Sequence, residues 1–214
     1  MKTIRLLILG IFLFGLLTPI SFAQKQVKQF RYAVKTNPLA ALGGPFWIAI
    51  VPMTGEYKVY FEVATGMKQS FQIGVSYLGP SVLINLEELS GEGGEIDDVK
   101  IAGFRTQGMY KFFLTRGTEA PEGFYVGPYI SYSSANVENK DDVNDNFSAK
   151  KITYDAALGY QLITDGGFSL DVFTGFGLRT LKWDYEDETN TQFDIFESKN
   201  AGHVAFGFSF GIAF

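Results

Sequence analysis

The sequence predicts an all-β fold: an eight-stranded antiparallel up-and-down transmembrane β-barrel that follows a cleaved signal peptide. Three observations favour it. Bulky apolar and very small side chains alternate over residues 204–214, the chain before them divides into similar stretches, and an aromatic residue recurs at the same end of each. Since neighbouring side chains of a strand point to opposite faces, the bulky face suits lipid and the small face suits a crowded barrel interior.

Residues 1–23 have the pattern of a secretory signal peptide. Lys2 and Arg5 precede an apolar run from Leu6 to Leu17, and small residues lead to a cleavage site after Ala23. The run is shorter than the ~20 apolar residues that a spanning helix needs. A signal peptide is therefore favoured over a membrane anchor.

The composition limits the kinds of protein to which the remaining domain, residues 24–214, can belong. Without the first 23 residues the chain keeps 16 basic and 23 acidic side chains, a net charge of −7, which argues against a nucleic-acid partner. The absence of cysteine excludes disulfides and thiolate metal sites. The 24 glycines, 21 phenylalanines and 11 tyrosines of the whole 214-residue chain favour strands and interfacial aromatic residues. One outer-membrane barrel domain fits this length.

Glycine, proline and polar clusters divide this domain into the expected strands. The strands are Phe30–Leu42, Trp47–Ala64, Gln69–Ile84, Val99–Thr115, Phe124–Val137, Phe147–Ile163, Phe168–Tyr185 and Lys199–Phe214. The connections alternate between short turns (65–68, 116–123, 164–167) and long polar loops (85–98, 138–146, 186–198). Short turns on one side and long loops on the other are typical of an outer-membrane barrel with both termini in the periplasm.

The direction of the apolar face separates two kinds of barrel. A soluble barrel would turn this face inward around a ligand cavity. The face of glycine and alanine in the last strand would be a poor surface in water, so we expect the apolar face outside. Aromatic residues at the turn end of every strand then form a girdle, as a membrane barrel requires. They are Tyr32, Phe61, Phe71, Phe112, Phe124, Tyr160, Phe168 and Phe214.

Four prolines resist this pattern, because each removes a hydrogen-bond donor from the sheet. We expect Pro38, Pro52, Pro80 and Pro128 at bulges or strand ends. The register of the first two strands stays open.

Three segments resemble those of small, uncharacterised outer-membrane barrel proteins of Gram-negative bacteria, which are similar in plan to OmpX and the membrane domain of OmpA. They are Lys35–Leu39, Glu56-Tyr57 and Gly123–Tyr129. The likeness covers almost the whole mature chain. It implies a fold and an outer-membrane location, and it identifies no active site.

If the apolar parity faces lipid, the opposite parity carries charges into the lumen. These are Arg31, Lys35, Glu56, Lys58, Glu62, Arg105, Lys111, Asp155, Asp171 and Arg179. An eight-stranded barrel is only wide enough for side chains to fill it, so we expect a plug of paired charges with no catalytic role. Which charges meet depends on the register. Loss of Arg105 is predicted to cost ~3–5 kcal/mol if the site is dry.

Candidate chemistry is sparse, and no catalytic, cofactor-binding or metal-binding residue is predicted. His203 is the only histidine, its parity points inward, and Ala205 stands where a lipid-face hydrolase would need serine. Asp142, Asn144 and Asn146 begin like a calcium loop, but the turn glycine and the closing glutamate are missing. This segment is better explained as a solvated loop.

The predicted function is therefore non-enzymatic: a structural or surface-interaction role in the outer membrane, through the acidic extracellular loops. The expected partners are outer-membrane lipid and lipopolysaccharide, with divalent cations as bridges, and the barrel-assembly machinery through the C-terminal strand ending at Phe214. Two alternatives stay open. One is an enzyme that modifies lipid A acyl chains, and the other is a narrow channel.

Overall fold

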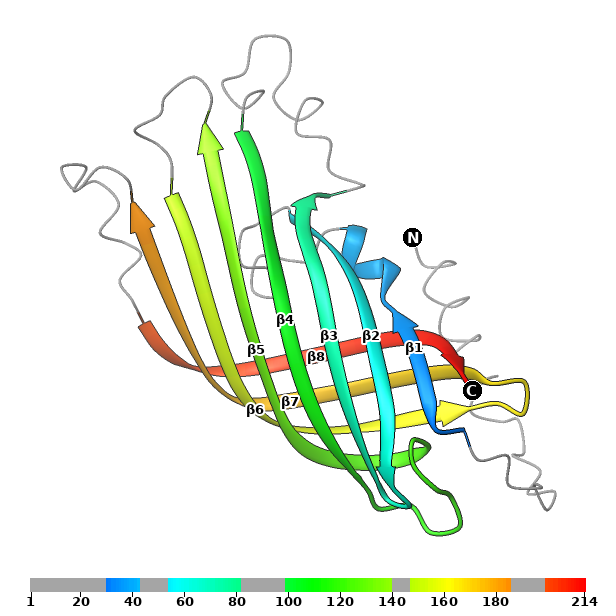
Figure 1. Ribbon diagram of the computed structural model, residues 1–214. Coiled ribbons are helices and arrows are strands. Elements are labelled where there is room, and N and C mark those ends of the chain that lie inside the picture. Colours follow the sequence, from blue (N-terminus) through cyan, green and yellow to red (C-terminus); the bar gives the residue numbers. More distant parts are fainter. Residues whose placement is uncertain (1–29, 43–53, 82–98, 140–146, 186–198) are drawn as a thin grey trace, which may run out of the picture.

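A closed antiparallel barrel of eight strands forms the molecule in the computed structural model, which describes residues 30–42, 54–81, 99–139, 147–185 and 199–214. Each strand pairs with the next along the chain, and β1 pairs with β8 (Figure 1). The strands are β1 Tyr32–Thr36, β2 Thr54–Gly66, β3 Gln69–Pro80, β4 Val99–Phe113, β5 Gly123–Asn139, β6 Phe147–Ile163, β7 Phe168–Tyr185 and β8 Lys199–Ala213. The predicted all-β, eight-stranded barrel is confirmed.

The short connections gather at one end of the barrel, which we call the turn end (Figure 1). The β2–β3 and β4–β5 connections touch there, because the backbone N–H of Ala120 donates to the carbonyl of Met67 at 2.8 Å. The β6–β7 turn meets the end of β8, where the Ala213 N–H donates to the Gly167 carbonyl at 2.7 Å. No helix among the described residues is long and apolar enough to cross a bilayer.

The first strand is shorter than predicted. It ends at Thr36 instead of Leu42, and a 3-10 helix, η1, occupies Pro38–Leu42. Pro38 has no N–H for the sheet and its ring fixes the φ angle of a turn, while Ala40 donates to the carbonyl of Asn37 at 3.2 Å. The third strand likewise ends at Pro80, not at Ile84. The predicted stretch before Thr54, with Pro52, lies outside the described residues.

Pro128 lies inside β5, at a gap in the pairing with β4. The register runs from the pair Met109–Tyr129 to the pair Phe112–Val126, with no paired residues between them. At the same place Gly127 lies so close to the carbonyl of Tyr110 that a Cβ would clash with it. The proline therefore falls where the ladder is already open, as expected for a strand of a closed barrel.

The outward face carries the apolar parity, as predicted. All eight expected girdle residues are exposed, from Phe124 at 39% to Phe214 at 61%. Around the seam between β1 and β8 they touch, because the Tyr32 ring lies 5.9 Å from that of Phe214 and 6.1 Å from that of Phe61. The predicted orientation of the two faces is confirmed.

The inward-facing side chains of β8 are small because other side chains and backbone atoms occupy the space beside them. A Cβ on Gly207 would clash with the ring of Phe173, which crosses from β7. A Cβ on Gly211 would clash with the carbonyl of Val34 on β1. The barrel interior is thus filled by side chains, as the diameter of an eight-stranded barrel requires.

Candidate functional site

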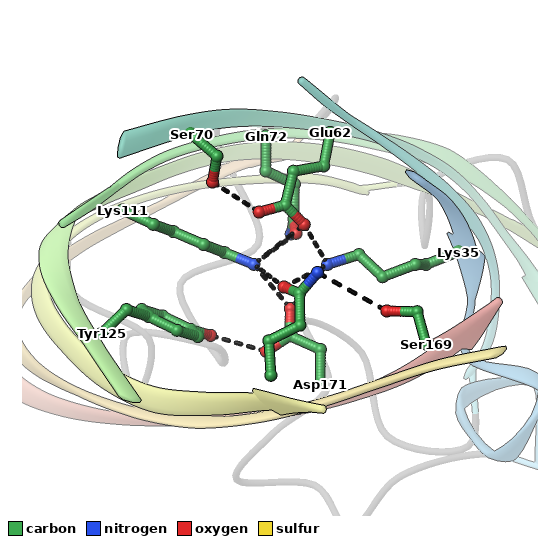
Figure 2. Close-up of polar contacts among 9 residues, drawn as sticks. Lys35, Glu62, Ser70, Gln72, Lys111, Tyr125, Ser169 and Asp171 are labelled. Carbon is green, nitrogen blue, oxygen red and sulfur yellow. Dashed lines mark hydrogen bonds and ion pairs between the residues drawn. The ribbon is translucent and has the colours of Figure 1, made fainter. Parts of the chain in front are cut away.

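Four charged side chains meet in the lumen toward the turn end, and we call them the inner cluster (Figure 2). Lys35 comes from β1, Glu62 from β2, Lys111 from β4 and Asp171 from β7. Lys35 Nζ lies 2.6 Å from Glu62 Oε2 and 2.7 Å from Asp171 Oδ2. Lys111 Nζ lies 3.2 Å and 2.7 Å from the same two oxygens. The two positive and two negative charges balance, and every one of these side chains is at most 1% exposed.

Neutral polar side chains complete the inner cluster. Gln161 Oε1 accepts from Lys35 at 3.1 Å and from Lys111 at 2.8 Å. The hydroxyl of Ser70 donates to Glu62 at 2.5 Å, and that of Tyr125 donates to Asp171 at 2.7 Å. No buried polar side-chain atom of the described residues lacks a hydrogen-bond partner. Charged side chains can be buried in a protein when their polar atoms are hydrogen-bonded or ion-paired in this way.

A second group of charges, the outer cluster, lies farther from the turn end and draws its side chains from β2, β3, β4 and β5. Glu56 is its centre, with Arg105 Nη1 at 2.7 Å and Lys58 Nζ at 2.9 Å from Oε2. Ser76 donates to the other carboxylate oxygen at 2.8 Å, and Ser133 accepts from Arg105 Nε at 2.8 Å. The side chains of Glu56, Lys58 and Arg105 keep 10–12% exposure. The outer cluster is therefore more exposed to solvent than the inner cluster.

His203 points inward from β8, as predicted, and contacts Asp155 of β6. Its Nδ1 lies 3.2 Å from both carboxylate oxygens of Asp155. Within the described part of the chain, no hydroxyl is hydrogen-bonded to the imidazole. The pair resembles the orienting half of a catalytic triad, but a nucleophile is not part of it.

Most of the predicted luminal charges lie in the lumen, with one exception. Arg31 precedes β1, is exposed, and donates its backbone N–H to the Phe214 carbonyl at 3.1 Å. The prediction that Arg31 lies in the lumen is wrong, because the alternation of β1 begins only at Tyr32. Arg179 is half-buried. The metal candidate at 142–146 and the acidic loops lie outside the described residues.

Some members of the inner cluster were not singled out from the sequence. Tyr125 and Gln161 are both fully buried, and both bond to charged residues of the cluster. Each has the inward parity of its strand, so the period of two did contain a signal for them. This signal is weak, because the position of a neutral side chain on the inward face does not show which charged residue it contacts.

The inner cluster can close the lumen of the barrel, but its described residues show no arrangement for catalysis. Side chains from opposite walls meet in the inner cluster (Figure 2), and the Tyr125 ring covers the Lys111 ammonium at 4.5 Å. Across the described ranges no three histidine, aspartate or glutamate side chains converge as a metal site. No family model, curated protein or solved structure shows significant similarity to this chain.

Proposed function

We propose that this chain is a non-enzymatic β-barrel protein of the Gram-negative outer membrane, with a structural or surface-interaction role carried by its acidic extracellular loops. The proposal rests on the sequence pattern of export and on the distribution of side chains over the two faces of the barrel. The predicted signal peptide of residues 1–23 supplies export. The barrel supplies a way to cross a bilayer with every backbone hydrogen bond satisfied.

The observation that carries the proposal is the apolar outward face. Phe206 is 70% exposed, Leu178 65%, Ile212 63% and Phe176 54%, and they lie on the neighbouring strands β7 and β8. Soluble monomers rarely expose apolar patches above a few hundred Å². Buried charges inside and exposed phenylalanines outside are the reverse of a soluble barrel, and this favours a lipid environment.

The last strand supports the proposed partnership with the barrel-assembly machinery. Its alternation ends at Phe214, whose backbone N–H and carbonyl both bond to Tyr32 and close the seam with β1. A machine that recognises this strand would therefore hold the segment that completes the barrel. Lipid and lipopolysaccharide are the proposed partners of the outward face and the loops.

The two alternatives are disfavoured by the lumen. A channel needs a water-filled bore, whereas the inner cluster fills the barrel with side chains that are at most 1% exposed. A lipid-modifying enzyme needs its catalytic group at the lipid, whereas His203 points inward to Asp155. We therefore assign the buried charges to stability.

Fractionation of cells that express the full chain tests the location. We expect the protein in the outer-membrane fraction, without residues 1–23, and with a gel mobility in detergent that changes on heating. A soluble folded protein in detergent-free buffer would overturn the proposal. Planar-bilayer conductance and lipid A mass spectra of cells with and without the gene test the channel and the enzyme, and we expect neither a steady open state nor a changed lipid A.

A further inference from the structure

Two lysines face each other on the outside of the barrel. Lys150 of β6 and Lys182 of β7 are register partners and both are exposed. Residues directly opposite in an antiparallel pair have Cβ atoms about 4.5–5.5 Å apart, and like charges at such a position destabilise the sheet. No hydrogen bond or ion pair joins either ammonium to another described residue. The pair therefore places two positive charges on neighbouring strands of the outward face.

The position of this pair along the barrel indicates its surroundings. On the outward face the preceding rungs of β6 and β7 include the pairs Tyr160–Val172 and Tyr154–Leu178. All four of these side chains are exposed. The apolar stripe stops at the two lysines.

The length of the stripe matches the thickness of a membrane. Tyr160, at the girdle, and Lys150 are ten residues apart on β6. At about 3.3 Å per residue and a strand tilt of about 35–45°, this separation corresponds to roughly 25 Å along the barrel axis. The apolar band of an outer-membrane barrel is about 25 Å tall. The lysine pair thus lies where the far headgroup layer would begin.

We propose that Lys150 and Lys182 together bind a phosphate group of a lipid headgroup in the outer leaflet. Two ammonium groups on adjacent strands supply up to six donors and two charges to one phosphate. The anion removes the repulsion between the lysines, and the stripe below them accommodates the acyl chains of the same lipid. This inference rests on the proposed outer-membrane location.

The test measures the affinity of the refolded mature chain in detergent for lipid A, by native mass spectrometry. The variant replaces both lysines, Lys150→Gln with Lys182→Gln. The matched control is Arg116→Gln, because Arg116 is an exposed cation at the turn end of the barrel. Enzymatically dephosphorylated lipid A and inorganic phosphate are the comparison ligands.

We expect the double variant to bind lipid A roughly 30-fold more weakly than the unmodified chain, since each basic residue near an anionic headgroup contributes on the order of 1 kcal/mol. Arg116→Gln should bind like the unmodified chain, and dephosphorylated lipid A should bind equally weakly to all three proteins. Equal affinities of the double variant and the unmodified chain for lipid A would overturn the inference. If inorganic phosphate alone displaced lipid A, the two lysines would be a site for free phosphate and not for a lipid headgroup, and this would also overturn the inference.

The outcome is separable from that of the proposed location. We expect the chain to insert into phospholipid vesicles with or without these two lysines. A chain that inserts but binds lipid A equally well with and without the lysines contradicts only the phosphate site. A chain that stays soluble without vesicles or detergent contradicts the membrane location itself.

Discussion

Lys35 and Lys111 reach across the barrel from opposite walls to one oxygen atom, Oδ2 of Asp171, and each ammonium lies 2.7 Å from it. Both also contact Oε2 of Glu62. The two cations and two anions form a closed square in which each charge has two opposite neighbours (Figure 2). The strands β1, β2, β4 and β7 are thereby tied together through the middle of the barrel.

Replacement of one lysine should unbalance this square. In Lys111→Met the carboxylates of Glu62 and Asp171 share only Lys35, and a net negative charge stays buried. Loss of one member of a buried ion pair costs ~3–5 kcal/mol. Urea unfolding in detergent measures this loss, and Arg116→Met, at an exposed position, should shift the free energy of unfolding by less than ~0.5 kcal/mol.

Restoring the charge balance should recover part of that stability. The double variant Lys111→Met with Glu62→Gln keeps one cation and one anion, Lys35 and Asp171, at their distance of 2.7 Å. We expect its loss to be smaller than the sum of the two single losses by about 0.5–3 kcal/mol, because neighbouring charges couple. Additive losses in the double-mutant cycle would show that the four charges act independently.

Arg105→Ala should cost less than Lys111→Met. Glu56 retains Lys58 at 2.9 Å and Ser76 at 2.8 Å when the guanidinium is removed. The cluster is also partly exposed, so the sequence-based figure of ~3–5 kcal/mol for a dry site is reduced to about 1–3 kcal/mol. The same urea titration orders the two variants. A larger loss for Arg105→Ala would place the drier site at the outer cluster.

Gly207→Ala tests the packing of the lumen. The new methyl group clashes with the ring of Phe173, and overpacking of a filled interior costs about 1–3 kcal/mol. Gly202→Ala is the matched control on the same strand, because a Cβ there meets no atom within 4 Å. We expect Phe173→Leu to rescue Gly207→Ala in the unfolding midpoint. Equal midpoints for the two alanine variants would contradict the contact between Gly207 and Phe173.

Phe206→Arg tests the proposed contact of the outward face with lipid. Phe206 lies between the girdle and the lysine pair and is 70% exposed, and an arginine at the bilayer midplane costs about 2–4 kcal/mol. Phe124→Arg, within the girdle at the turn end, should cost only about 0–1 kcal/mol. Unfolding from phospholipid vesicles measures both. A barrel surrounded by water would tolerate the two arginines alike.

The period of two predicts the number of strands and the face of the barrel on which most of their residues lie. These properties are local, because they depend only on neighbours in the sequence. The chemistry of proline indicates that Pro38 interrupts the sheet, whereas the alternation alone predicts a first strand that continues to Leu42. The structure ends the strand at Thr36 and begins a 3-10 helix at Pro38, so the missing donor outweighed the pattern.

The pairs within the lumen could not be predicted from the same pattern. Lys35 and Asp171 are separated by 136 residues, and Lys111 and Asp171 by 60. Their meeting depends on the register of every strand between them, and a shift of one residue would turn each side chain to the other face. Tyr125 completes the site for a similar reason, since only the closed barrel brings its hydroxyl to Asp171 at 2.7 Å.

The seam between β1 and β8 sets the order of events in assembly. Described register pairs across it run only from Ala33–Ala213 to Thr36–Phe210, whereas β7 and β8 pair from Phe168–Ile212 to Leu181–Lys199. The carbonyl of the last residue, Phe214, accepts the N–H of Tyr32 at 3.0 Å. The wall therefore cannot close before β8 has been made, and the β1–β8 ladder, the shortest among the described strands, is the one formed last. We expect the same line to be the first to separate when the folded chain is strained, so that the barrel opens sideways as a curved sheet.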